Sequence, residues 1–128
     1  MNIRFFISFW FSALLIASAS YGQQDSISEL ESPVVYVFDI KEQIAPPVWR
    51  KTQKAMQEAR DKNADLIIID MNTYGGMVQT ADSIRTAIMQ SPIPVYTFIN
   101  NNAASAGALI SIASDSIYMR PGSNIGAA

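Results

Sequence analysis

Apolar and polar positions along the chain follow two patterns. The first pattern, short continuous apolar runs, predicts strands. Three apolar runs are rich in β-branched and aromatic residues: "VVYVFDI" at 34–40, "ADLIIIDMN" at 64–72 and "IPVYTFIN" at 93–100. This composition is typical of buried strands, and the continuous middle run indicates a central strand of a parallel sheet. A shorter fourth strand is predicted over "DSIYMRP" at 115–121.

The second pattern has apolar residues every three or four positions, and this periodicity predicts helices between the strands. The first helix follows "APP" at 45–47, where proline is acceptable in the first turn. Its expected buried stripe is Val48, Thr52, Ala55, Met56 and Ala59, and its expected solvated face carries Arg50, Lys51, Lys54, Arg60 and Lys62. The second helix has the stripe Val78, Ala81, Ile84, Ile88 and Met89, and the small residues of "AASAGALISIAS" at 103–114 predict a third.

The resulting order alternates strictly between strand and helix. Such alternation predicts an α/β fold with right-handed crossovers and a parallel sheet. The 128 residues are enough for one domain with a real core. We expect this domain to occupy 33–128 and to be incomplete at its C-terminus, because the last residues, "GSNIGAA", would leave an apolar loop without a partner.

The first 22 residues differ from the rest and predict a signal peptide. Arg4 is their one charge, and the apolar run "FFISFWFSALLIA" that follows has signal-peptide length and is short for a membrane span. An uncleaved anchor is the alternative. Residues 23–32 are polar and read as a flexible leader, so the folded part is expected to be exported, on the periplasmic or extracytoplasmic side of the membrane.

Charge and composition exclude several classes of function. The chain has 9 Lys and Arg against 11 Asp and Glu, a net charge of −2, which offers no basic surface for nucleic acid. It contains no cysteine, so no disulfides are expected. It contains no histidine either, so a Ser-His-Asp triad cannot form, and neither a metal nor a cofactor is expected.

Two places could carry chemistry, the glycine pair Gly75-Gly76 and Ser105. Each follows a predicted strand, and the carboxyl ends of neighbouring parallel strands are where ligands bind. The glycine loop could present backbone amides to an oxyanion, although such a pair is more often only a turn. Ser105 is expected in the first turn of the third helix, and its spacing alone favours a closely packed serine over a nucleophile.

A nucleophilic serine needs a base, and the residues leave its identity open. Lys41 is the only lysine outside the first helix, and nothing around it indicates burial. Asp39 and Asp70 end predicted strands and are alternatives, although capping and turn roles fit them as well.

The segments "DLIIIDMNTYGGMVQTADSIRTAI" and "PVYTFINNNAASAGALISIASDSIYMRPGSNIGAA" resemble the NfeD family of membrane-associated serine proteases, within the ClpP and crotonase fold superfamily. The resemblance covers 34–128. It implies a ClpP/crotonase-like spiral of repeated ββα and βαβ units, and a Ser-Lys dyad protease with Ser105 as nucleophile. Gly75, Gly76 and Met77 would form the oxyanion loop. Tyr74 departs from the proline that the family usually has at this position.

By the same resemblance, the dyad lysine would lie beyond Ala128, and a downstream region would attach the protein to the membrane. Apolar segments of membrane-associated proteins would be its substrates, a stomatin-like membrane protein its partner, and a homo-oligomer its assembly. Two other functions remain open: a non-catalytic exported module for assembly or binding, and a crotonase-like hydratase or isomerase. The hydratase would need a carboxylate base, and no glutamate follows Glu58.

Overall fold

The structure is a computed structural model that describes residues 32–126. The predicted signal peptide, and the polar leader except for its last residue, lie outside the described residues. The elements, in chain order, are β1 (Val35–Ile40), α1 (Pro46–Asp61), β2 (Leu66–Thr73), α2 (Val78–Met89), β3 (Val95–Ala104), α3 (Ala106–Ser111), β4 (Ser116–Met119) and β5 (Asn124–Gly126).

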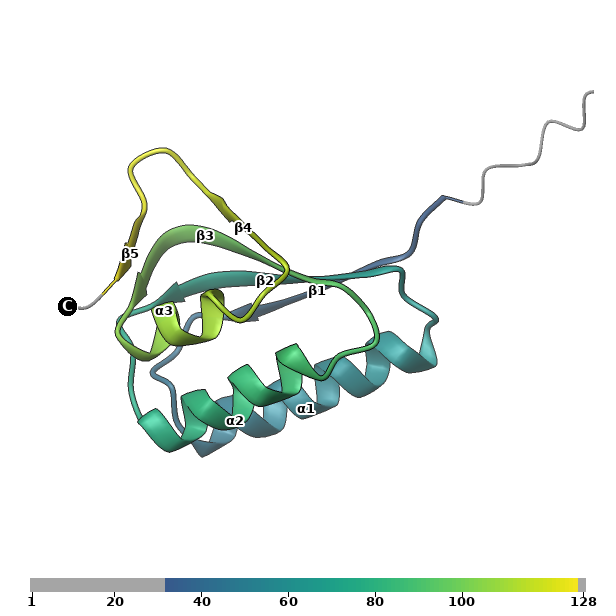
Figure 1. Cartoon of the computed structure of the whole chain (residues 1–128), viewed down its shortest axis with the longest axis horizontal. Coiled ribbons are helices and arrows are strands. Elements are labelled where there is room, and N and C mark those ends of the chain that lie inside the picture. The colour runs from purple at the N-terminus through teal and green to yellow at the C-terminus, as the bar shows by residue number, and fades with distance from the viewer. Residues whose placement is uncertain (1–31, 127–128) are drawn as a thin grey trace, which may run out of the picture. The chain divides into compact units, whose positions relative to one another are not determined.

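The described residues form one parallel sheet with its helices on one face (Figure 1). The strand order is β1-β2-β3-β4, and β5 pairs with β3 beyond the β4 pairing. Every pairing is parallel, which confirms the α/β fold predicted from the alternation of strands and helices. In this arrangement the carboxyl ends of β2 and β3 meet at the same edge of the sheet.

The helices bury the apolar stripes that their spacing predicted. In α1 the buried residues are the predicted five, Val48, Thr52, Ala55, Met56 and Ala59. In α2 the predicted Ala81, Ile84 and Ile88 are buried, but the prediction was wrong for Val78 and Met89, which are the first and last residues of the helix and lie exposed. Within residues 32–126, no helix has the length and apolar character needed to cross a bilayer.

The core lies between the helices and one face of the sheet. Along β2 buried and half-buried residues alternate, so Ile67, Ile69 and Met71 point into the core. Ile99 of β3 and Ile40 of β1 join them, and all five are at most 1% exposed. Removing such a side chain from water contributes about 1.5–3 kcal/mol, so this face holds the sheet and the helices together.

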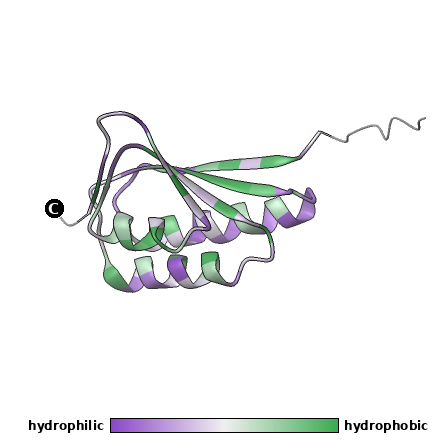
Figure 2. Cartoon of the chain, turned by 45° about the horizontal axis from the view of Figure 1, so that its top comes forward, coloured by the Kyte–Doolittle hydropathy of each residue, from purple (hydrophilic) through white to green (hydrophobic). Residues whose placement is uncertain are grey.

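The opposite face of the sheet is covered by no element among the described residues. Val37, Phe98 and Tyr118 lie on it and remain 59%, 37% and 55% exposed. Hydrophobic colour runs along β1 and β2, whereas the helices also carry hydrophilic bands (Figure 2). The expectation that 34–40 forms a buried strand was therefore wrong in one respect: β1 is an edge strand with one open face.

The end of β3 and the last described residues differ from the prediction. β3 continues past Asn100 to Ala104, because a register shift opposite Asn72 is followed by renewed pairing of Ala103 with Thr73. Residues 124–126, expected to be an unpartnered loop, form β5 against 102–104. Residues 103–114 contain a helix of only six residues, α3, and the fourth strand is shorter than predicted, at Ser116–Met119.

Candidate active site

Ser105 occupies the turn between β3 and α3, in a conformation that is unfavourable for a residue with a side chain. Its φ is 50° and its ψ is −114°, so Ser105 precedes the helix. The sequence had suggested a position in the first turn of the helix. Positive φ costs a non-glycine residue about 1–3 kcal/mol unless its surroundings enforce it. Here they do, because the Ser105 N–H donates to the carbonyl oxygen of Gly126 at 2.7 Å and the Ser105 carbonyl accepts from Ala108 and Leu109.

The hydroxyl of Ser105 makes no hydrogen bond among the described residues. The residue is exposed, and although it holds the cap position of α3, its hydroxyl makes no capping hydrogen bond. A serine at this position normally caps the first free amides of the helix. Ser105 therefore presents a hydroxyl without a hydrogen-bond partner among the described residues, on a constrained strand-to-helix turn.

Gly75 lies directly beside that turn. A Cβ atom at position 75 would lie 2.9 Å from Cβ of Ser105 and 3.0 Å from the carbonyl oxygen of Ala104. Its φ is 107°, a backbone conformation that residues other than glycine rarely adopt. The structure thus brings together the two places that the sequence singled out separately.

Gly76 is held from its other side by Ile44, a contact that the sequence did not indicate. Ile44 donates its N–H to the Gly75 carbonyl at 2.9 Å and accepts the N–H of Met77 at 2.8 Å. A Cβ on Gly76 would lie 2.7 Å from the Ile44 nitrogen. Met77 belongs to the loop, as predicted, but its amide is already used and is not available to an oxyanion.

The amides near Ser105 that have no acceptor among residues 32–126 include two that the reaction below uses. They are the N–H of Gly76, an exposed residue of the glycine loop, and the N–H of Ala106, the first residue of α3. The Gly75 amide is not free, because it donates to the hydroxyl of Thr73 at 3.1 Å. Ala106 was missed from the sequence, since an alanine offers no side-chain signal for a backbone donor.

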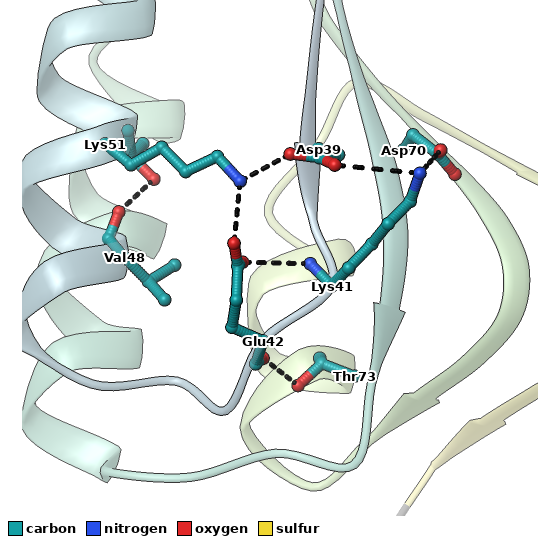
Figure 3. A network of polar contacts seen from close by, with 8 residues as sticks. Asp39, Lys41, Glu42, Val48, Lys51, Asp70 and Thr73 are labelled. Atoms are coloured by element: carbon teal, nitrogen blue, oxygen red, sulfur yellow. Dashed lines mark hydrogen bonds and ion pairs between the residues drawn. The ribbon is translucent and has the colours of Figure 1, made fainter.

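The lysines nearest the strand ends are held in ion pairs (Figure 3). Lys41 lies 2.7 Å from Asp70, and this hydrogen bond raises the pKa of Lys41. Burial lowers the pKa of Lys51, but its hydrogen bonds to Asp39 and Glu42 outweigh that effect and leave the pKa raised. Both amines are therefore protonated at neutral pH and cannot act as a base. Lys51 lies on the predicted face of α1 and is half-exposed, but its amine is paired with Asp39 and Glu42.

The carboxylates considered as bases are engaged in the same network. Asp39 and Asp70 are in register on β1 and β2, and Lys41 forms an ion pair with each of them. The hydrogen bond from Lys51 lowers the pKa of Asp39, so this carboxylate is a weak base. Among the described residues, no hydrogen bond joins Ser105 to a carboxylate or to a lysine.

The parallel sheet, the glycine loop after β2 and the serine turn after β3 define a domain of the ClpP and crotonase class. Its family follows from the sequence: the chain belongs to the family of the NfeD1b N-terminal domain, whose family model matches residues 34–128. This match confirms the resemblance stated above.

Two curated relatives are similar over most of the chain. Membrane protein NfeD1b of Bacillus subtilis is 39% identical over 101 residues, which are 79% of this chain and 23% of the relative. Membrane-bound protease PH1510 of Pyrococcus horikoshii is 38% identical over 101 residues, 77% of this chain and 23% of the relative. The chain thus spans about a quarter of the length of each.

Solved structures confirm the fold. The 1510-N membrane protease from Pyrococcus horikoshii, specific for a stomatin homolog, matches with a TM-score of 0.70 and 37% identity, over 75% of this chain and 50% of that chain. A lysine-to-alanine mutant of 1510-N in complex with a substrate peptide also matches. Enoyl-CoA hydratase EchA3 of Mycobacterium ulcerans shares the fold at a TM-score of 0.60 and 14% identity, over 67% of this chain and 48% of that chain.

Proposed function

We propose that the chain is the nucleophile-bearing part of a serine endopeptidase of the Ser-Lys dyad type, with Ser105 as nucleophile. The observation that carries the proposal is the Ser105 turn itself: an exposed, unbonded hydroxyl in a strained conformation beside a loop of two required glycines. Strain at a strand-to-helix turn is also what presents the serine of other hydrolases. Membership of the family and the named proteases among the relatives support the proposal.

In this reaction the Ser105 Oγ attacks the carbonyl carbon of a peptide bond. The carbonyl oxygen then becomes an oxyanion, which preorganised N–H donors stabilise. The N–H groups of Gly76 and Ala106 are suited to this task. Ala106 directly follows Ser105, Gly76 directly follows the glycine that packs against Ser105, and neither amide has an acceptor among the described residues. Removing one such donor in other enzymes costs about 100-fold to 1,000-fold in kcat.

The base of the dyad is a lysine downstream of Ala128. This part of the proposal is supported by the ion pairs of Lys41 and Lys51, which keep both amines protonated. A catalytic lysine instead needs a lowered pKa, so that it can take the proton from Oγ and later give it to the leaving amine. Residues 1–128 alone are then expected to be inactive.

The substrates in this proposal are apolar segments of membrane-associated proteins, and a stomatin-like membrane protein is the proposed partner. The relative 1510-N, described as specific for a stomatin homolog and solved with a substrate peptide, supports both. We further propose export by the signal peptide at 1–22, attachment to the membrane through a downstream region, and a homo-oligomeric assembly.

The test compares the full-length protein with its Ser105→Ala variant in cleavage of an apolar peptide library and in labelling by a fluorophosphonate. Ser83→Ala, which removes a surface hydroxyl from α2, is the matched control. Cleavage and labelling are expected for the wild type and the control and should be absent from Ser105→Ala. Equal cleavage by all three proteins would refute the proposal and would favour the non-catalytic binding module.

A further inference from the structure

Thr73, the last residue of β2, touches both halves of the site through the two branches of one side chain. It is 2% exposed and pairs with Ala103, two residues before Ser105. It has no part in the reaction described above, which uses the hydroxyl of Ser105 and backbone amides. Its contacts nevertheless reach the glycine loop on one side and α3 on the other.

The hydroxyl of Thr73 fixes the glycine loop. It donates to the carbonyl oxygen of Glu42 at 2.7 Å (Figure 3) and accepts the N–H of Gly75 at 3.1 Å. Because a hydroxyl has one proton, the bond to Glu42 leaves its lone pairs for Gly75. The same bond ties down the segment that leads to Ile44, which holds the loop from the other side. Together these contacts orient the loop with the Gly76 amide unbonded.

The methyl group of Thr73 fixes the start of α3. A Cβ at Gly107 would lie 2.6 Å from the Thr73 Cγ2 atom, closer than atoms can pack. Glycine is unfavourable inside a helix, so this close approach explains why the second residue of α3 carries no side chain. Gly107 directly follows Ala106 and lies two residues after Ser105, so this contact is close in the chain to both.

We propose that Thr73 is a positioning residue for the reaction at Ser105, setting the Gly76 amide through its hydroxyl and the Ser105 turn through its methyl group. The inference rests on the proposed function and adds a residue to it. A shift of about 1 Å in such a site can cost about 100-fold in rate, so one buried side chain that spaces both halves has a large effect on catalysis. Because donors to an oxyanion act on the transition state, the effect falls on kcat rather than on KM.

The first experiment measures kcat, KM and thermal stability of the full-length protein and three variants. Thr73→Val keeps the shape and removes the hydroxyl, and Thr73→Ser keeps the hydroxyl. Thr52→Val is the matched control, because Thr52 is also buried and donates to a carbonyl, that of Val48, but lies in α1 away from the site. We expect Thr73→Val to lower kcat by about 100-fold and Thr52→Val to leave kcat unchanged. Thr73→Ser should lower kcat less than Thr73→Val, because it keeps the hydroxyl bonds to Glu42 and Gly75 and loses only the methyl contact.

Equal kcat values for Thr73→Val and Thr52→Val would overturn the inference. A second experiment uses the methyl contact and does not depend on Thr73→Val folding. Gly107→Ala should lower kcat, and Thr73→Ser in the same chain should restore it, because without Cγ2 the nearest atoms to the new methyl lie at 3.7 Å and 3.8 Å. Additive losses in the double variant contradict the proposed contact.

The rate of hydrogen exchange at the Gly75 amide tests the role of Thr73 without depending on the proposed protease activity. Exchange should be faster in Thr73→Val than in the wild type and Thr73→Ser, whether or not the protein cleaves peptides. If Ser105→Ala still cleaves, the proposed function fails, and the exchange rates alone decide whether Thr73 fixes the loop. Identical exchange in the wild type and Thr73→Val would show that it does not.

Discussion

Gly75 and Ser105 are packed so closely that a methyl group on Gly75 would reach within 2.9 Å of the Ser105 Cβ atom. Gly75→Ala should therefore destabilise the protein and disrupt the site at once. The positive φ of 107° and the overlap together should cost about 3 kcal/mol of unfolding free energy. Urea unfolding measures this loss, and fluorophosphonate labelling reports the state of Ser105.

Gly122→Ala is the control for this prediction. Gly122 also has a positive φ, of 84°, but a Cβ there would meet nothing within 4 Å. Its substitution should therefore show backbone strain alone, about 1 kcal/mol, and leave labelling unchanged. Equal losses at the two positions would mean that crowding against Ser105 contributes nothing.

The strain at Ser105 predicts that removing its side chain does not destabilise the fold. Ser105→Ala loses no hydrogen bond and keeps the strained backbone, so its stability should match that of the wild type. Ser105→Gly should exceed Ser105→Ala by about 1 kcal/mol, because glycine adopts φ of 50° without strain. Urea unfolding of the two variants tests this order, and a less stable glycine variant would show that the turn is not strained.

The lowered pKa of Asp39 predicts a contribution to stability that acid removes. The hydrogen bond from Lys51 holds this pKa below its ordinary value of 3.8, so the contribution is present above about pH 4 and is lost as the pH falls through the lowered pKa. Because the side chain is 41% exposed, solvent screens the pair, and Asp39→Asn should cost only roughly 0.5 kcal/mol at pH 7.

Unfolding curves measured from neutral to acid pH should therefore converge for the wild type and Asp39→Asn. Asp61→Asn, at the exposed end of α1, serves as the control substitution. A gap between the wild type and Asp39→Asn that persists in acid would assign the effect to packing rather than to charge.

Tyr74 is exposed where the proposed reaction would bring substrate to the glycine loop. It stands next to the glycine pair, is 78% exposed, and lines a shallow pocket with Lys41, Glu42 and Gly76. Tyr74→Ala should leave the melting temperature unchanged and raise KM for apolar peptides, since an aromatic surface available to the substrate is lost. A fall in melting temperature with unchanged KM would instead give Tyr74 a structural role.

The sequence was sufficient for the elements whose signals are local. The apolar run at 64–72 identified the central strand, and the stripe from Val48 to Ala59 identified the buried face of α1, because both depend only on periodicity. It was insufficient where pairing is long-range. Residues 124–126 have no strand-like composition, and they form β5 only because β3 offers them a partner.

For the site, sequence reasoning found Gly75, Gly76 and Ser105 but could not find what holds them. The resemblance to a known family singled out Ser105 as a nucleophile, whereas spacing alone favoured a packing role. The unbonded amides, the Ile44 bridge and the double contact of Thr73 depend on backbone positions that only the folded chain defines. The ion pair of Lys51 was missed for the same reason, because its partner Asp39 lies on another element.

The register shift at the end of β3 determines how far Ser105 lies from the last regular pairing of the sheet. Between its pairings at Met71 and Thr73, β2 advances two residues while β3 advances four, from Ile99 to Ala103. The two extra residues in β3 are an even number, so Ala103 still faces the helices and the packing of the core is unchanged. Relatives that lengthen or shorten the asparagine run at 100–102 by two residues could thus change how far the serine projects while leaving the domain beneath it intact.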